Sequence, residues 1–262
     1  MGLERNRLDT PLGIVEFERT KEEIVRYLPQ PPATVADIGG GPGAYALWLA
    51  QLGYSVVHRD LVPHHVDEMR RSAAAVGVSI DAGVGDARDV DIPDGSVAAV
   101  LLLGPLYHMT RRLDRLRALQ EARRILRSGG MVFAAAISRW VPRLHADVAL
   151  RLYRELGDLT DELDVLERTG NMRRPIYPQA FAGFCHRPRQ LRDEITAAGL
   201  ECLDLMSLEG LAFALPDLEE RLASPEDRVV VLNAARKLSR VPELMGLGPH
   251  LLAVGRRPEG PA

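Results

Sequence analysis

The chain has 262 residues, enough for one large domain or for one domain with an elaborated segment. Hydrophobic residues make up 46% and charged residues 26%, which excludes a disordered chain. Acidic residues outnumber basic ones by 36 to 33, and the resulting charge of −3 gives no basis for binding nucleic acid or an anionic membrane surface.

The sequence shows no segment typical of a membrane span, a secretory signal or a cysteine-based metal site. The longest apolar run, Val97 to Leu103, is far shorter than the roughly 20 residues that cross a bilayer. The N-terminus is charged and lacks the apolar core of a secretory signal. Cys185 and Cys202 are too few and too far apart for a redox pair or a metal knuckle. We therefore expect a cytoplasmic protein without a bound metal.

The first half of the chain alternates apolar strands with helices. The predicted strands cover 34–38, 55–59, 78–80, 97–103 and 131–137. The predicted helices cover 44–51, 64–76 and 111–127, the last ending at Gly129-Gly130. Strands of continuous apolar character that alternate with helices predict a parallel sheet with helices on both faces.

The pattern changes after Ser138. Residues 139–187 mix prolines, aromatic residues and charges, which predicts an inserted helical or irregular segment without another strand–helix unit. After it we expect helices at 188–198 and 218–238 and strands at 200–205 and 250–255.

The most informative segment is the glycine-rich turn after the first strand, Asp37-Ile-Gly-Gly-Gly-Pro-Gly. Gly39, Gly41 and Gly43 carry no Cβ and accept positive φ, so a ligand can approach this backbone closely. The amides at the start of the next helix point into the same space. A tight turn without any ligand is the plain alternative.

Two further acids follow neighbouring strands, and each of them alone could equally be a solvated loop residue. Asp60 ends the second strand, 21 residues after Gly39, where a carboxylate accepts hydrogen bonds from ribose hydroxyls. Asp86 follows the third strand, where it would accept from an adenine amino group while the Ala87 amide donates to the ring. Ligands of open α/β sheets bind at these carboxyl ends.

Gly39, Gly41 and Ala44 also satisfy the dinucleotide fingerprint G-x-G-x-x-G/A. Asp37, two residues before Gly39, would repel a pyrophosphate and attract an ammonium or sulfonium group, which favours a cationic nucleoside cofactor. Asp37 could instead bond only the amides of the turn.

The segments DIGGGPG, GDA around Asp86, LLLGPLYHM and EARRILRSGGMVFAA, together with Asp60, resemble class I S-adenosylmethionine-dependent methyltransferases over residues 34–137. The resemblance implies a Rossmann-like, seven-stranded α/β sheet of order 3-2-1-4-5-7-6 with strand 7 antiparallel. It implies one domain over residues 1–262, with an N-terminal helical cap at 1–30 and a substrate-cap insert at 139–187.

The resemblance also implies roles for single residues. The glycines 39–43 would cradle the methionine part of S-adenosyl-L-methionine, Asp60 and the adjacent Leu61 would hold the nucleoside, and Leu103 and Gly104 would form the floor near the sulfonium. The substrate would lie between the segment Phe17–Leu28 and the insert.

For the acceptor side, Tyr107 and His108 directly follow the fourth strand, so both side chains could reach the transferring methyl group and both are catalytic candidates. His108 would serve as a general base because imidazole titrates near neutral pH. Packing under the insert and capping the next helix are the alternatives. Phe17, Tyr177, Phe181 and His186 are the candidate substrate contacts, with a structural role as the alternative for His186. Gly104-Pro-Leu-Tyr lacks the amide or carboxylate that base methyltransferases place there.

The leading hypothesis is thus a methyltransferase (EC 2.1.1.-) for a small molecule such as a secondary metabolite, acting by in-line displacement. The alternatives are a nicotinamide-dependent oxidoreductase and a cofactor-binding protein without turnover. The apolar content of the insert suits either a substrate lid or a homodimer contact.

Overall fold

The computed structural model describes residues 7–155, 159–173, 175 and 182–259. The chain divides into two compact units. The glycine-turn unit comprises Ile24–Ala135, Arg192–Asp204 and Ala253–Ala262. The insert unit comprises Met1–Glu23, Ala136–Leu191 and Leu205–Leu252.

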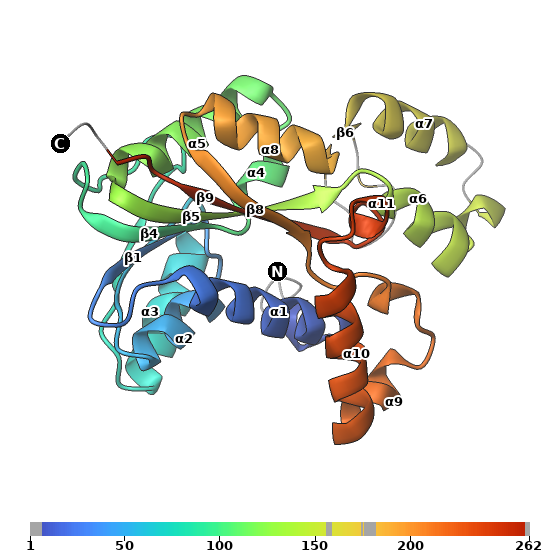
Figure 1. The fold of residues 1–262 in the computed structure, drawn as a ribbon, viewed down its shortest axis with the longest axis horizontal. Coiled ribbons are helices and arrows are strands. Elements are labelled where there is room, and N and C mark those ends of the chain that lie inside the picture. Colours follow the sequence, from blue (N-terminus) through green and yellow to red (C-terminus); the bar gives the residue numbers. More distant parts are fainter. Residues whose placement is uncertain (1–6, 156–158, 174, 176–181, 260–262) are drawn as a thin grey trace. The chain divides into compact units, whose positions relative to one another are not determined.

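The glycine-turn unit is built on parallel strands β1 (Thr34–Ile38), β2 (Ser55–Asp60), β3 (Asp81–Val84) and β4 (Val97–Leu102). Its helices are α2 (Ala44–Gln51), α3 (Pro63–Ala75), α4 (Pro105–His108) and α5 (Arg112–Ile125). Figure 1 shows α2 and α3 on one face of these strands and α4 and α5 on the other. Every residue of β4 is buried, as expected for a central strand covered on both sides.

Three further strands complete the sheet: β5 (Leu126–Ser138), β8 (Glu201–Ser207) and β9 (His250–Arg256). The order is β3-β2-β1-β4-β5, with β9 paired to β5 and β8 paired to β9. β9 runs antiparallel to β5, because the Arg257 amide donates to Gly130 and the Ser138 amide donates to Pro249. The predicted order 3-2-1-4-5-7-6 with an antiparallel seventh strand is therefore confirmed, β8 and β9 being the predicted strands 6 and 7.

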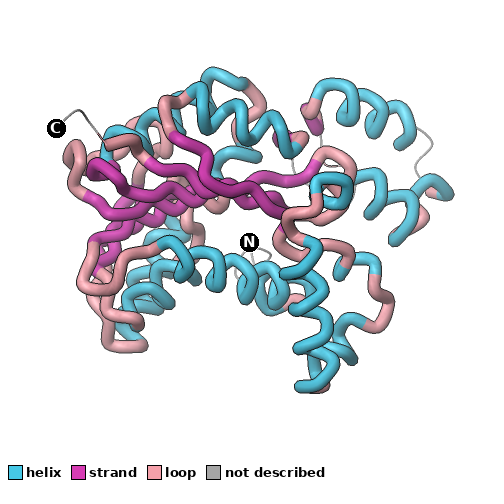
Figure 2. Tube along the Cα trace, viewed as in Figure 1, coloured by secondary structure: helices cyan, strands magenta, loops and turns pink. Residues whose placement is uncertain are grey.

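Most remaining elements are helical, as Figure 2 shows by colour. They are η1 (Arg7–Asp9), α1 (Pro11–Tyr27), α6 (Val141–Arg143), η2 (Leu144–Ala149), η3 (Leu152–Arg154), α7 (Leu159–Thr169), α8 (Pro188–Ala197), η4 (Ala212–Ala214), α9 (Leu218–Ala223), α10 (Pro225–Leu238) and α11 (Pro242–Met245). Within the described part of the chain, no helix combines the length and the apolar character that a membrane crossing requires.

The third strand begins later than predicted, at Asp81 instead of Val78. Gly77 ends the preceding helix with φ +70° and donates to Ala74, and the Val78 amide donates to Ala73. These two bonds form the usual glycine-terminated helix end, so Val78 belongs to the cap of α3.

The end of α5 was also predicted too late. The helix ends at Ile125, and Gly129-Gly130 lies inside β5. The pairing of β4 with β5 shifts between Val97 and Ala99, and Gly129 adopts φ +72° there. Gly129 thus accommodates the irregular pairing of β4 with β5, because this position of the strand requires a positive φ.

Two other predictions need correction. The helix expected over 218–238 is split into α9 and α10, because Ser224 caps α10 by accepting from the Asp227 amide and Pro225 starts it. The insert contains a small hairpin of β6 (Asn171–Met172) and β7 (Gly183–His186), and β7 pairs with β5 through Ile137 and Cys185. No strand was expected there.

Candidate functional site

The turn between β1 and α2 requires glycine at specific positions. Gly39, Gly41 and Gly43 have φ of +67°, +58° and +87°. A Cβ on Gly39 would lie 2.4 Å from the Pro105 ring, and a Cβ on Gly43 would lie 2.4 Å from the Met69 sulfur. Both the backbone conformation and the close packing therefore exclude larger side chains.

The turn after β4 approaches the glycine turn. A Cβ on Gly104 would lie 2.9 Å from the Gly39 carbonyl oxygen. Leu103 and Gly104 are half-buried, so this floor remains partly accessible. The carboxyl ends of β1 and β4 thus bring Gly39 and Gly104 together. The role of Leu103 and Gly104 as the floor near the sulfonium stays a prediction.

Asp60 connects the second strand to the glycine turn. Its Oδ2 accepts the Gly41 amide at 2.8 Å, and its Oδ1 accepts the Val62 amide at 2.9 Å. The Nδ1 atom of His65 lies 3.1 Å from Oδ1. A buried carboxylate held by backbone amides has a fixed orientation, and Oδ2, with one partner here, keeps capacity to accept another hydrogen bond.

Asp86 is held by a neighbour that the sequence analysis did not consider. The amide and Nε of Arg88 both donate to Asp86 Oδ1 at 2.9 Å, and an Arg88 terminal nitrogen donates to Oδ2 at 2.6 Å. These hydrogen bonds with Arg88 hold the pKa of the Asp86 carboxyl below its usual range. Asp86 is therefore ionised and oriented, and Ala87 beside it is buried.

Exposed apolar side chains lie beside these two acids. Leu61 is 63% exposed, Val84 is 55% exposed and Val62 is 43% exposed. They follow β2 or end β3, the strands whose carboxyl ends carry Asp60 and Asp86. Large aliphatic groups exposed next to two carboxylates suit a ligand with a flat apolar face and polar edges.

Asp37 is completely buried on β1. Neither of its carboxylate oxygens has a hydrogen-bond partner among the described residues, so the predicted alternative of bonding the turn's amides is not present in the structure. His58 of β2 places its Nδ1 atom 3.5 Å from Asp37 Oδ2. A buried carboxyl group without hydrogen bonds favours a positive group nearby.

Tyr107 and His108 belong to α4, the short helix after β4. Tyr107 is buried, with its hydroxyl 3.7 Å from where a Cβ on Gly104 would lie, whereas His108 is exposed. The two rings lie 4.8 Å apart between centroids. Tyr107 therefore packs behind the floor residue, and His108 is the ring accessible to solvent.

The candidate substrate contacts lie in the insert unit or outside the described residues. Phe17 is half-buried on α1, with the Lys21 ammonium 4.5 Å from its ring centroid. Tyr177 and Phe181 fall outside the described residues. His186 is fully buried on β7, edge-on to Phe184 at 4.7 Å. The ring of His186 is thus closed off by the described residues, and its role as a substrate contact stays a prediction.

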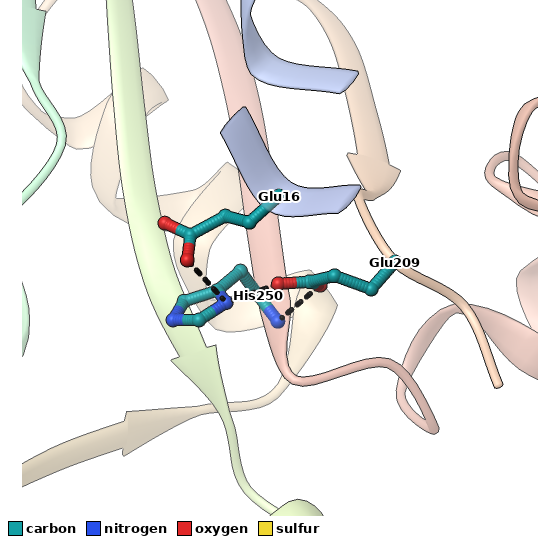
Figure 3. A group of neighbouring side chains, drawn as sticks. All are labelled: Glu16, Glu209 and His250. Carbon is teal, nitrogen blue, oxygen red and sulfur yellow. Dashed lines mark hydrogen bonds and ion pairs between the residues drawn. The ribbon is translucent and has the colours of Figure 1, made fainter. Parts of the chain in front are cut away.

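A second cluster of titratable residues, missed by the sequence analysis, lies in the insert unit. Glu16 of α1, Glu209 after β8 and His250 of β9 place one ligand-type atom each within 4.8 Å of the others (Figure 3). His250 Nδ1 is hydrogen-bonded to Glu209 Oε1, and its amide donates to Oε2 at 3.0 Å. Arg7 also donates to Glu16.

This cluster has the geometry of an ion-pair network. His250 Nδ1 faces the carboxylates of both Glu16 and Glu209, and Arg7 neutralises part of the charge of Glu16. Burial lowers the pKa of His250, but the carboxylates of Glu16 and Glu209 outweigh it and raise the pKa to about 9. The protonated form of His250 is therefore favoured at neutral pH.

The glycine-turn unit fits the expected cofactor. Asp37 is a buried side chain whose carboxyl oxygens have no hydrogen-bond partner in the described chain, so they are available to pair with a cationic ligand. Asp60, Asp86 and the exposed Leu61 lie at the carboxyl ends of neighbouring strands. This set matches an ammonium, a ribose and a purine better than a diphosphate.

Comparison with known proteins agrees. Residues 35–130 match the family model of a methyltransferase domain. The ubiquinone biosynthesis O-methyltransferase of Methylocella silvestris is 32% identical over 116 residues, 44% of each chain. The ubiquinone/menaquinone biosynthesis C-methyltransferase of Acidiphilium cryptum is 34% identical over 123 residues, 45% of this chain and 48% of that one. The matched stretch spans about half the length of these curated relatives.

A solved S-adenosylmethionine-dependent methyltransferase from Methanosarcina mazei shares the fold. It superposes with a TM-score of 0.62 at 17% identity, covering 91% of this chain and 98% of that one. Residues 35–130 are thus similar to a methyltransferase domain, and the chain shares the fold of a solved S-adenosylmethionine-dependent methyltransferase, with the strand order expected for it.

Proposed function

We propose that the chain transfers the methyl group of S-adenosyl-L-methionine to a small-molecule acceptor. The observation that carries this proposal is the grouping of the glycine turn, Asp60 and Asp86 at the carboxyl ends of β1, β2 and β3 within one unit. Ligands of open α/β sheets bind at this edge.

The roles of the cofactor residues follow from their surroundings. Gly39, Gly41 and Gly43 leave the backbone open to the methionine part. Asp60, whose Oδ2 atom accepts the Gly41 amide, would hold the ribose. Leu61 would offer an apolar surface to the adenine, and Asp86 and the Ala87 amide would hydrogen-bond its edge.

S-adenosyl-L-methionine supplies a methyl group already activated by its sulfonium, so the chain's own contribution is mainly positioning. Leu103 and Gly104 form the floor beside the glycine turn. His108, exposed on α4, accepts the proton of a hydroxyl or amine acceptor, and Tyr107 supports the floor from behind.

A small acceptor is supported by two observations. The net charge of −3 gives no electrostatic attraction for nucleic acid. Both curated relatives are named for ubiquinone or menaquinone biosynthesis and so act on small molecules. We extend this to an acceptor of the secondary-metabolite type, held between α1, with Phe17, and the insert.

Calorimetry and a transfer assay test the proposal. S-adenosylmethionine and S-adenosylhomocysteine should bind with measurable heat, and NADH should not. A panel of phenols, quinols and amines with radiolabelled methyl donor should then reveal a methylated product. Saturation by NADH without binding of S-adenosylmethionine would assign an oxidoreductase instead. Tight cofactor binding with no transfer to any acceptor class would assign a binding protein.

A further inference from the structure

His58 and Asp37 form an isolated polar pair inside the glycine-turn unit. The two residues are directly opposite each other in the pairing of β1 with β2, and both side chains are completely buried. His58 Nδ1 lies 3.5 Å from Asp37 Oδ2. Within the described chain, neither ring nitrogen of His58 and neither oxygen of Asp37 has a hydrogen-bond partner.

The pair lies directly beneath the glycine turn. A Cβ on Gly40 would lie 2.1 Å from Asp37 Oδ2, so the carboxylate is pressed against the backbone of the turn. The neighbouring Gly39 and Gly41 are the residues expected to receive the methionine part of the cofactor. The buried Asp37 side chain thus lies close to where that end of the cofactor is expected.

A buried carboxylate without hydrogen bonds is unfavourable unless a positive group or a donor compensates it. His58 is the one polar side chain that the described structure places near enough to do so, at slightly more than hydrogen-bond distance. His58 alone therefore compensates the buried Asp37 side chain only in part, and a cation bound above the turn would supply the remaining compensation.

We propose that His58 is a positioning residue for the cofactor: its ring holds the Asp37 carboxylate beneath the glycine turn, where it attracts the α-ammonium group of the methionine end. This rests on the proposed function, since it assumes that the cofactor binds at the turn. His58 acts through Asp37 and makes no contact with the reacting methyl group.

The test compares two ligands that differ at one end. S-adenosylhomocysteine carries the α-ammonium, whereas 5′-methylthioadenosine shares the nucleoside and the thioether but lacks the amino-acid end. By calorimetry, His58→Phe should weaken S-adenosylhomocysteine binding at least tenfold and change 5′-methylthioadenosine binding less than twofold. His58→Asn, which keeps a donor near the position of Nδ1, should restore most of the lost affinity.

Two controls isolate the mechanism. His64→Asn changes an exposed histidine on α3 that pairs with Glu68, and it should leave both affinities unchanged. In the Asp37→Asn background, His58→Phe should cause no further loss, because residues that act through one another are not additive. In the wild-type protein, the ¹⁵N signal of the His58 ring should move on adding S-adenosylhomocysteine but not on adding 5′-methylthioadenosine.

The outcomes are distinct. An equal loss of both ligands in His58→Phe, or additive losses with Asp37→Asn, would show that His58 only supports the fold and would overturn the inference. If His58→Phe does not fold, the inference is tested by the ¹⁵N signal of the wild-type His58 ring and by the affinities of His58→Asn. A ring signal that S-adenosylhomocysteine does not move would then overturn the inference. Wild-type protein that binds neither ligand would refute the proposed function itself.

Discussion

Asp60 is the acid at the site with the clearest structural definition. It accepts backbone amides from both the glycine turn and the segment after β2, so one carboxylate fixes two loops. A hydrogen bond to a charged group contributes roughly 1.5–3 kcal/mol. Its removal therefore affects both the shape of the turn and the group that would bind ribose.

We expect Asp60→Ala to weaken S-adenosylmethionine binding by more than tenfold, which is about 1.4 kcal/mol. Calorimetry measures this directly, with a thermal melt to show that the variant is folded. Asp67→Ala, which removes an exposed carboxylate of α3 paired with Arg70, is the matched control. Unchanged affinity in Asp60→Ala would remove Asp60 from the cofactor site.

His108 is the second single residue with a testable role, in deprotonation of the acceptor and not in cofactor binding. Because its ring is exposed and its proposed role is toward the acceptor, His108→Ala should leave S-adenosylmethionine affinity largely unchanged. Turnover with an acceptor found in the transfer screen should fall by about 10²–10⁴-fold, the usual contribution of a general base. His64→Ala serves as the control, and full turnover in His108→Ala would exclude the base role.

At the scale of elements, glycine has two separate functions in this chain. Gly77 and Gly95 have positive φ with open space around the missing Cβ, so they only end a helix or form a turn. Gly39 and Gly43 have positive φ and also face Pro105 and Met69 at close range. Only the second kind links separate elements of the fold.

A pair of substitutions separates these functions. Gly77→Ala, at φ +70°, should cost about 1 kcal/mol of unfolding free energy through backbone strain alone. Gly39→Ala, at φ +67°, should cost clearly more and should abolish cofactor binding, since its Cβ meets the Pro105 ring. Urea unfolding and calorimetry measure both effects, and equal costs would show that the contact with Pro105 is easily relieved.

At the scale of the whole chain, the insert unit depends on residues far apart in sequence. The Glu16, Glu209 and His250 network joins α1, the segment after β8 and the first residue of β9 (Figure 3). Arg236 and Arg240, in and just after α10, form further ion pairs with Glu22 and Glu23 of α1. Electrostatic contacts thus tie the N-terminal helix to the C-terminal third of the chain.

This network predicts how stability depends on pH. Histidine ordinarily titrates near 6.5, and the neighbouring carboxylates raise the pKa of His250 to about 9 in the folded chain. The resulting stabilisation is fully present below about pH 6.5 and is lost as the pH rises through 9. The melting temperature should therefore fall over this range, by roughly 2–4 °C for each kcal/mol lost.

His250→Gln should melt at a lower temperature at neutral pH and should lack the fall between pH 6.5 and 9. His64→Gln, at an exposed position, should retain the wild-type profile. Differential scanning calorimetry in matched buffers makes the comparison. A wild-type profile that is flat over this range would contradict the assignment of a proton to His250.

The sequence determined the local features of this protein. The strand–turn–helix units, the glycine turn and the positions of the acids at the ends of β2 and β3 were predicted from short-range rules: apolar periodicity, turn chemistry and the position of a residue at a strand end. The antiparallel last strand was implied by the family resemblance and is confirmed. Two element boundaries were predicted wrongly although local residues encode them. Ser224-Pro225 starts a new helix and Gly77 ends one, but the apolar pattern continues through both positions.

Only the tertiary structure decided which distant side chains meet. His58 faces Asp37 because β1 and β2 pair in one particular register, and a shift by one residue would separate them. Glu209 meets His250 across 41 residues, and β7 joins β5 across the insert. Such contacts are set by the packing of whole elements and leave no periodic signal in the chain, whereas local structure is encoded in neighbouring residues.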